Sequence, residues 1–388
     1  MSITAPKGFV AAGIHCGIRK NGHRDLALVR SLEPATGAGM FTANRVQAAP
    51  VVVSREHLEL AQPQAVVVNS GVANAATGAQ GIAGARATAA EVGRMLGVAE
   101  QEVLVLSTGV IGEQLPLDNV LAGVRSAALQ LSRCGGSTAA DAIMTTDTRA
   151  KEARAPGAGF AVGGMAKGSG MIHPNLATML AVVTTDYPLE PGEAIEFLRP
   201  AVDASFNAIS VDGECSTNDT VILLANGANG IERTPESDAE FAACVRSVCG
   251  ELARQIVADG EGATVLAEIA VRGAATEPEA RAIAERVATS PLVKTALHGH
   301  DANWGRIAAA AGSARFGGGY AHLDPDKLTI VIDGVPVLVS GSPSGDEPVL
   351  MNGHCAIELD LALGDGAATY LTTDLSYDYV RINADYRS

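Results

Sequence analysis

The sequence predicts a mixed α/β (α+β) protein, folded as a layered sandwich of sheets and helices with two domains. Short runs rich in Val, Ile and Leu alternate along the chain with longer segments in which Ala, Leu, Glu and Arg recur at helical spacing. The 388 residues exceed what one ordinary core holds, and a composition of 47% hydrophobic and 18% charged residues is typical of a globular protein.

The elements follow from these patterns in chain order. The predicted strands are residues 65–69, 103–107, 328–332, 356–361 and 368–373. The predicted helices are residues 84–96, 117–131, 191–205, 239–258 and 278–289. In the first helix, Ala85, Ala89, Val92 and Leu96 follow a 4-3-4 spacing, and Gly97 is expected to end it. We expect breaks or loops in the glycine-rich stretches 157–170, 317–319 and 340–347.

Charge and hydropathy exclude several classes of protein. The net charge is −15 and no cluster of Lys and Arg occurs, which argues against binding of nucleic acids or anionic membranes. No apolar run approaches the ~20 residues of a membrane-spanning helix. The first ten residues lack the pattern of a secretory signal, so we expect a cytoplasmic protein.

The six cysteines are scattered and form no CxxC pair, so we expect free and mostly buried thiols, in agreement with a reducing cytosol. They are Cys16, Cys134, Cys215, Cys244, Cys249 and Cys355.

Residues 167–186, KGSGMIHPNLATMLAVVTTD, admit two interpretations. In the first, a glycine-rich loop enters a buried strand, and Thr178 is a β-branched residue at its start. In the second, Thr178 is a nucleophile. A threonine hydroxyl needs an adjacent base, and breakage of the Ala177–Thr178 bond would free an α-amine of pKa about 8 to serve as that base. The residues by themselves leave both interpretations open.

Eight short motifs occur in one order along the chain. They are NSG with Asn74 (69–74), STGVIG (107–112), IMTTDT (143–148), the segment around Thr178, STNDT (216–220), DGEG (259–262), NWGR (303–306) and INADYRS (382–388). Together they resemble the ornithine acetyltransferase family, also described as glutamate N-acetyltransferases. The resemblance extends along nearly the whole chain.

The resemblance implies that Thr178 both cleaves its own chain after Ala177 and carries the acetyl group. Processing would give an α chain of residues 1–177 and a β chain of residues 178–388. Thr108 and Gly109 match the family's oxyanion-hole pair. They follow an apolar strand, and glycine lets a backbone N–H approach closely. Without the resemblance, a plain strand-to-turn transition explains them as well.

The family's substrate-binding positions map onto Thr145, Lys167, Thr178, Glu261, Asn383 and Ser388. A cation and an anion, Lys167 and Glu261, complement a substrate with a carboxylate and an ammonium group. Which group each one holds is open, and Glu261 is also explained as an acid in a turn beyond a helix. Chain ends are usually frayed, so Asn383 and Ser388 require this end to be tied into the cleft. The family commonly ends in threonine, and Ser388 keeps its hydroxyl.

The implied reaction moves an acetyl group from N-acetylornithine to glutamate through acetyl-Thr178, within arginine biosynthesis. We expect no cofactor, because the chain contains neither GxxxxGK[ST] nor a GxGxxG after a strand. Acetyl-CoA is a secondary donor at best, and whether the chain uses it is open. The resemblance also implies a heterotetramer of two α and two β chains.

Histidines offer two further interpretations. His298 and His300, followed by Asp301, resemble a zinc-binding pattern, but the acid lies one residue too early. We therefore expect no metal, and two solvated loop histidines. His173 lies five residues before Thr178 and is a candidate base that the α-amine makes unnecessary.

Two other functions remain open from the sequence. A self-processed amidohydrolase or aminopeptidase would use water as the acceptor, and a non-catalytic binding protein would never cleave itself.

Overall fold

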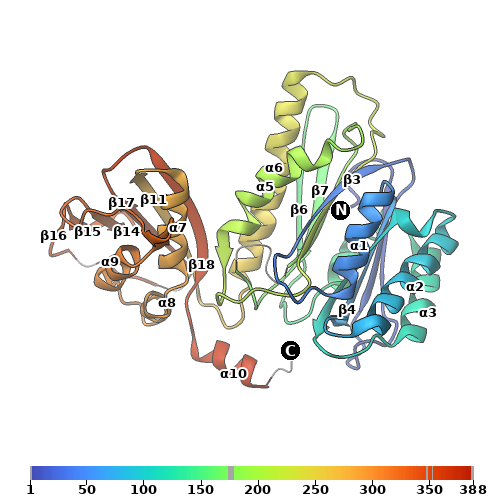
Figure 1. Ribbon diagram of the computed structural model, residues 1–388, viewed down its shortest axis with the longest axis horizontal. Helices are drawn as coiled ribbons and strands as arrows, with labels where there is room; N and C mark the ends of the chain where they lie inside the picture. The colour runs from blue at the N-terminus through green and yellow to red at the C-terminus, as the bar shows by residue number, and fades with distance from the viewer. Residues whose placement is uncertain (1, 174–178, 347, 352, 386–388) are drawn as a thin grey trace. The chain divides into compact units, whose positions relative to one another are not determined.

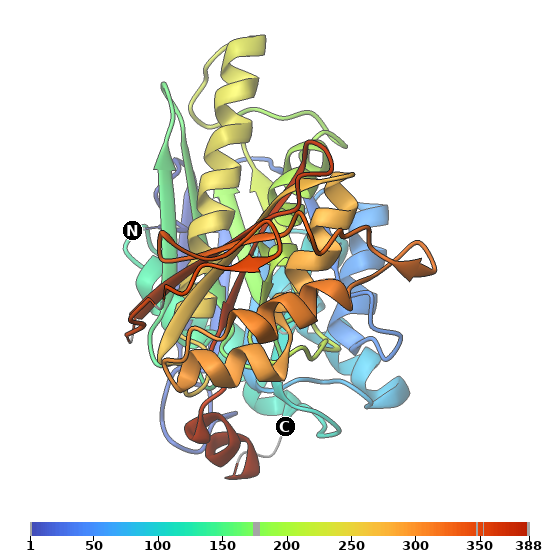
Figure 2. The same ribbon diagram turned by 90° about the vertical axis from the view of Figure 1, so that its left-hand side faces the viewer.

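The structure, a computed structural model, describes residues 2–173, 179–346, 348–351 and 353–385. Of these, 2–207 and Glu214–Ile256 form a first compact unit, and Ala208–Gly213 with 257–385 form a second. Figures 1 and 2 show that each unit consists of sheets with helices packed on them, which confirms the predicted α/β class. The units do not follow the expected chain boundary after residue 177, because 179–207 fold within the first unit.

The first unit contains a four-stranded sheet of order β1-β2-β4-β5, in which only β4 and β5 are parallel. Its strands are β1 (Phe9–Ile14), β2 (Leu26–Ser31), β4 (Ala65–Val72) and β5 (Val103–Val110). Side chains alternate between its faces, so that Ala65 and Val67 contact one core while Val66 and Val68 contact another. Helices α2 (Gly78–Leu96) and α3 (Leu117–Gln130) pack side by side on the first of these faces (Figure 1).

A second sheet of the first unit, of order β3-β10-β8-β7-β6, packs on the other face. Its strands are β3 (Thr36–Phe41), β6 (Lys151–Pro156), β7 (Ala161–Lys167), β8 (Leu180–Thr185) and β10 (Thr220–Ala225). The shared core joins Val66, Val68, Leu104 and Leu106 of the first sheet to Met165, Leu180, Val182, Ile222 and Leu224 of the second. Two sheets face to face, with helices outside, are the predicted layered sandwich.

Four further α-helices occur among the described residues of the first unit. α5 (Ala194–Asp203) contacts β3 and β10, and α6 (Pro235–Ala258) lies over β7, where Leu252 and Val248 contact Gly164. α1 (Ala49–Leu60) is tied to β5, because the Ser54 hydroxyl donates to the Val105 carbonyl at 2.7 Å and accepts from its N–H at 2.8 Å. α4 (Gly136–Ala142) packs on β1 and β2, and short 3-10 turns occur at Glu100–Glu102 and Phe206–Ala208.

The glycine-rich stretch 157–170 is not the continuous break that the sequence predicts, because β7 occupies its central half. Its glycines allow close packing rather than a loop. A Cβ on Gly163 would lie 1.8 Å from the Ser2 carbonyl oxygen, and one on Gly164 would lie 2.9 Å from side-chain atoms of α6. Small residues therefore let this strand fit between the N-terminal segment and the helix.

The second unit is a seven-stranded sheet of order β16-β15-β14-β17-β11-β18-β9. Its strands are β9 (Ile209–Ser210), β11 (Val265–Ala274), β14 (Thr329–Ile332), β15 (Val335–Val339), β16 (Ser342–Pro343), β17 (Gly353–Asp360) and β18 (Gly366–Thr373). A separate hairpin joins β12 (Arg315–Phe316) to β13 (Gly319–Tyr320). Helix α7 packs on β11 and β18 and contacts α9 and α8 (Figure 2). The helices are α7 (Glu277–Ala288), α8 (Pro291–His298), α9 (Trp304–Gly312) and α10 (Tyr377–Asp385).

Every strand and helix predicted from periodicity occurs, with shifted ends. Gly97 ends α2 as expected, in the left-handed region with a φ of +72°. All six cysteines are free, but Cys134 is exposed and only Cys244, Cys249 and Cys355 are buried. Among the described residues, no helix is both long and apolar enough to span a membrane.

Phe241 of α6 lies at the centre of an aromatic cluster in the first unit. Its ring stacks on Tyr187 at 4.5 Å between centroids and meets the edges of Phe197 and Phe160 at 4.9 and 6.0 Å. We predict that Phe241→Ala lowers the free energy of unfolding by about 3–5 kcal/mol, because a buried ring is lost and a cavity remains. Urea unfolding measures this change. The control is the exposed Leu129→Ala, expected to stay within about 0.5 kcal/mol; an equal loss in both variants would contradict the prediction.

Candidate active site

The end of β5 carries the predicted oxyanion-hole pair. Thr108 is buried, and Gly109 has a φ of +132°, a conformation that residues with a Cβ rarely adopt. A Cβ on Gly109 would lie 2.2 Å from the carbonyl carbon of Gly71 on β4. Glycine is therefore required for this close approach of two strands. The role of its N–H toward an oxyanion stays a prediction.

A buried polar network fixes this end of the sheet. The Ser107 hydroxyl donates to Asn69 Oδ1 at 2.5 Å, and Asn69 Nδ2 donates to the Val72 carbonyl at 2.9 Å. The Asn218 amide then donates to the Ser107 carbonyl at 2.8 Å. Because all of these groups are buried, each bond stabilises one arrangement of the residues that flank Thr108.

The Asp147 carboxylate organises two of the predicted substrate residues. Its oxygens accept from the Thr145 N–H at 2.9 Å, from the Gly168 N–H at 2.7 Å and from Lys151 Nζ at 2.6 Å. Burial by itself would raise the pKa of Asp147, but the positive charges of Lys167 and Lys151 and these hydrogen bonds outweigh it and lower the pKa to about 2. Asp147 is thus a buried anion that pairs with Lys151 and is influenced by the charge of the buried Lys167.

Lys167 is the last residue of β7 and pairs with Leu180 at the start of β8. It is only 2% exposed, and its positive charge acts to lower the pKa of both Asp147 and Asp219. Thr145 and Lys167 both interact with the Asp147 carboxylate, the first through its backbone N–H and the second through its charge. Their role in substrate binding stays a prediction.

Arg19 also binds the backbone around Thr145. Its guanidinium donates to the Met144 carbonyl at 3.0 Å and to the Thr145 carbonyl at 3.5 Å. Its own N–H donates to the buried Asp25 carboxylate at 2.9 Å.

Three predicted site residues, Ala177, Thr178 and Ser388, lie outside the described residues. The described chain stops at His173, which is half-buried, and resumes at the buried Met179, directly before β8. The roles of these three residues stay predictions.

In the second unit, Glu261 and Asn383 meet directly. Asn383 Nδ2 donates to the Glu261 carboxylate at 2.8 Å, across 122 positions of sequence. Helix α10, which carries Asn383, is tied to the same turn, because the Ser376 hydroxyl donates to the Gly262 carbonyl at 2.7 Å and accepts from the Tyr379 N–H at 3.1 Å. The end of the described chain is thus held against residues 261–262. The role of Glu261 and Asn383 in substrate binding stays a prediction.

The prediction of two solvated loop histidines is wrong for His298. It is the last residue of α8, its Nδ1 lies 2.9 Å from the buried Asp374 carboxylate, and its ring packs edge-on against Tyr377. His300 is exposed. In the described part of the chain, no three His, Cys, Asp or Glu side chains gather as metal ligands would.

Sequence reasoning missed Lys294, a lysine buried in the second unit. Its ammonium donates to the Thr372 hydroxyl at 3.0 Å, and also to the Thr373 carbonyl and hydroxyl. Burial lowers the pKa of Lys294 from 10.5 to about 8, although the charges of Asp212 and Asp374 act to raise it. The sequence signal was weak, because Lys294 stands alone in an amphipathic helix.

Asp147, Asn218 and Asp219 were also assigned no role, although each lies within a quoted motif. Asp147 precedes the half-buried β6, and Asn218 and Asp219 directly precede the buried β10. Only the structure shows the backbone groups that these residues bind.

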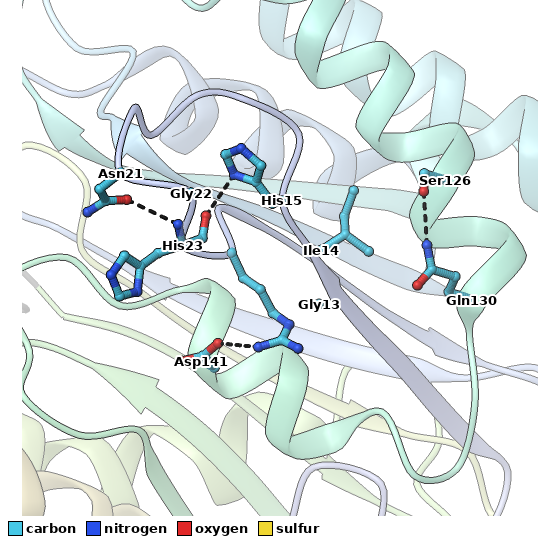
Figure 3. A pocket seen from close by; sticks show the side chains of 10 residues that line it. Gly13, Ile14, His15, Asn21, Gly22, His23, Ser126, Gln130 and Asp141 are labelled. Atoms are coloured by element: carbon cyan, nitrogen blue, oxygen red, sulfur yellow. Dashed lines mark hydrogen bonds and ion pairs between the residues drawn. The ribbon is translucent and has the colours of Figure 1, made fainter.

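A pocket of about 580 Å³ in the first unit lies apart from the predicted residues. Arg24 pairs with Asp141 at 2.8 Å, and His15 Nδ1 lies 2.8 Å from the His23 carbonyl oxygen. Figure 3 shows His15, His23 and Asp141 at this pocket. None of the predicted site residues that the structure describes lines this pocket, and its charged groups bind one another.

We predict that Asp147→Asn lowers the free energy of unfolding by about 3–5 kcal/mol, because Lys151 and Lys167 lose their buried counter-charge. The pKa of Asp147 is lowered from 3.8 to about 2, so its stabilising contribution is complete above pH 3.8 and is lost as the pH falls through 2. Urea unfolding between pH 7 and pH 2 measures both effects. The control Asp141→Asn breaks only the surface pair with Arg24 and should change stability by less than about 1 kcal/mol.

A second prediction concerns Lys294. Because its pKa in the folded state is lowered, protonation favours the unfolded chain, and stability should rise as the pH increases from about 8 to 10.5. This contribution is about 3 kcal/mol. Lys294→Met should lack that part of the rise, while the exposed Lys327→Met should keep it. The measurement is the free energy of unfolding by denaturant at both ends of this pH range. An equal change in this free energy in wild type and in Lys294→Met would contradict the lowered pKa of Lys294.

Comparison with known proteins gives consistent matches. The sequence model of the ArgJ family matches residues 10–388. The arginine biosynthesis bifunctional protein ArgJ of Streptomyces coelicolor is 46% identical over 391 residues, covering 100% of both chains. That of Geobacter sulfurreducens is 47% identical, covering 98% of this chain and 99% of the relative. A solved ornithine acetyltransferase of Mycobacterium tuberculosis, complexed with ornithine, is 42% identical over 45% of this chain and 94% of its own, with a TM-score of 0.42. The resemblance drawn from the motifs is confirmed, and the chain belongs to the ArgJ family.

Proposed function

We propose that this chain is a glutamate N-acetyltransferase of arginine biosynthesis, which moves the acetyl group of N-acetylornithine to glutamate. The observation that carries the proposal is identity of 45–47% along essentially the whole chain with relatives that are named arginine biosynthesis bifunctional proteins. The alternative of a self-processed amidohydrolase or aminopeptidase is not favoured by these relatives.

We assign the nucleophile to Thr178, freed by cleavage after Ala177. Thr178 Oγ attacks the acetyl carbonyl, and its α-amine takes the hydroxyl proton. The amide C–N bond then breaks, and ornithine leaves with that proton. The amine of glutamate attacks the acetyl ester in turn, which regenerates the Thr178 hydroxyl and releases N-acetylglutamate.

The oxyanion formed in each step needs donors aimed at it, a role that we assign to the Gly109 N–H and the Thr108 hydroxyl. The close backbone approach that only glycine permits at position 109 supports this assignment.

We assign substrate binding to Thr145, Lys167, Glu261 and Asn383, with Thr178 and Ser388. The grouping of Thr145 and Lys167 around Asp147 in one unit supports this proposal, as does the contact between Glu261 and Asn383 in the other. The charges of Lys167 and Glu261 suit a substrate that carries both a carboxylate and an ammonium group.

Cleavage after Ala177 would leave the two chains associated. The sheet β3-β10-β8-β7-β6 takes β3, β6 and β7 from the proposed α chain and β8 and β10 from the proposed β chain. Fourteen buried side chains of the proposed α chain and four of the proposed β chain share its core. We propose that two such α/β pairs form a heterotetramer in the cytoplasm, as the family resemblance implies.

The test is intact mass under denaturing conditions, before and after incubation with N-acetylornithine. We predict two chains, and a gain of one acetyl group on Thr178 of the β chain. Thr178→Ala should give one uncleaved chain and lower the formation of ornithine from N-acetylornithine and glutamate at least about 10³-fold, because the covalent route is lost. The control Thr295→Ala removes an exposed hydroxyl and should leave both readouts unchanged.

Cleaved, acetylated protein from Thr178→Ala would overturn the assignment, as would full activity in material whose Ala177–Thr178 bond is intact. Replacement of glutamate by water as acceptor tests the hydrolase alternative. A parallel assay with acetyl-CoA and glutamate decides whether this donor is used.

A further inference from the structure

A buried turn lies directly before β10 in the first unit. It comprises residues 216–219, and its last two side chains, Asn218 and Asp219, are 5% and 0% exposed. These two neighbours bind different parts of the chain.

Asn218 binds the first sheet. Its Nδ2 donates to the Ala73 carbonyl at 2.6 Å and to the Ser107 carbonyl at 2.8 Å, and its Oδ1 accepts from the Thr217 hydroxyl at 2.6 Å. Ser107 directly precedes Thr108, so the amide holds the turn against the end of β5 that carries the predicted oxyanion-hole pair.

Asp219 binds the start of β8 in the second sheet. Its Oδ1 accepts from the Met179 N–H at 3.0 Å, while the Met179 carbonyl accepts from the Thr220 N–H at 3.2 Å. Met179 is thus held on both sides, by the side chain of Asp219 and by the backbone of the next residue. It is the residue that follows Thr178 in the sequence.

We infer that Asn218 and Asp219 are positioning residues, which set the backbone that follows Thr178 at a fixed place relative to the strand that carries Thr108 and Gly109. The inference rests on the proposed function. Both self-cleavage and acetyl transfer require Thr178 Oγ and the oxyanion donors to face one carbonyl group. Such reactions are sensitive to small errors of placement, and a displacement of about 1 Å can lower a rate 10²-fold.

The role of Asp219 is that of a hydrogen-bond acceptor. Burial raises the pKa of its carboxyl well above the usual range, against the opposing effects of the Met179 N–H and the Lys167 charge. An amide of the same shape keeps an oxygen that can accept from the Met179 N–H, whereas a methyl group does not. Asp219→Asn should therefore keep the function that Asp219→Ala loses.

The chain offers a matched control at the opposite end of the same strand. Asp186 directly follows β8, is also buried, and accepts from the backbone N–H groups of Lys7 and Ala161 at 2.9 and 2.8 Å. Asp186→Ala removes the same kind of bond without touching Met179 or the turn.

The experiment measures three quantities in each variant of the full chain: the rate of self-cleavage on denaturing gels, kcat and KM for N-acetylornithine with glutamate, and the midpoint of thermal unfolding. We expect Asp219→Ala to lower the cleavage rate and kcat at least about 10²-fold, with KM within about threefold of wild type. Asp219→Asn should restore both rates to within about tenfold. Asp186→Ala should lower the unfolding midpoint by a similar amount to Asp219→Ala, with kcat close to that of wild type.

The inference is overturned if folded Asp219→Ala cleaves and turns over as wild type does, or if Asp186→Ala loses kcat to the same degree. If Asp219→Ala does not fold, Asn218→Ser decides by the same criteria: a fall in kcat without a change in KM supports the inference, and an unchanged kcat refutes it. A wild-type chain that neither cleaves nor transfers acetyl refutes the proposed function instead.

Discussion

One buried carboxylate, that of Asp147, holds together the part of the first unit where the predicted substrate residues lie. An ammonium group leaves water only when an anion and hydrogen-bond acceptors replace its hydration, and here two lysines depend on the same anion. The same oxygens accept the backbone N–H groups of Thr145 and Gly168. The same carboxylate therefore both balances the charge of the lysines and fixes the position of the backbone. A change at Asp147 affects the end of β7, the loop at 145 and the two cations at once.

Face-to-face packing of two sheets supplies the second constraint. The apolar residues of β4 and β5 alternate, so one set contacts α2 and α3 and the other set contacts the second sheet. Polar groups at the ends of the strands can therefore form hydrogen bonds from one sheet to the other. Asn218 and Asp219 use that position, because each binds backbone groups of a different sheet. Packing thus decides which ends face each other, and hydrogen bonds decide their final placement.

Much of this architecture could be predicted from the sequence, because the signals are local. Strand β5 and helix α2 follow from runs of Val and Leu and from a 4-3-4 spacing, and Gly97 ends its helix in the expected conformation. Strand β7 could not be predicted, because its glycines are typical of a loop. Only the packing of the Ser2 carbonyl and helix α6 against them explains why glycine is needed in this strand. The prediction that His298 is a solvated loop residue was wrong for a similar reason, because its partner Asp374 is 76 positions away in the sequence.

The residues of the candidate site also fall into two groups, those that the sequence predicts and those that only the structure shows. The site residues predicted from the sequence are those that match motifs of a family: Thr108, Gly109, Thr145, Lys167, Glu261 and Asn383. Their supporting residues carry no such mark. Asp147 and Asp219 are ordinary acids in the sequence, and they become distinctive only as buried groups that bind backbone N–H groups from distant segments. Long-range pairing is the information that periodicity does not contain.

The sheet β3-β10-β8-β7-β6 contains strands from both sides of the proposed cleavage site. Cleavage therefore changes how the protein refolds after it has unfolded. A precursor reaches this sheet as one molecule, by a first-order search. After scission, the unfolded state consists of two separate polypeptides, and their reunion is second order and depends on dilution. Unfolding has no such dependence. The lifetime of the cleaved protein is therefore set by the activation barrier to unfolding, rather than by the rate of refolding.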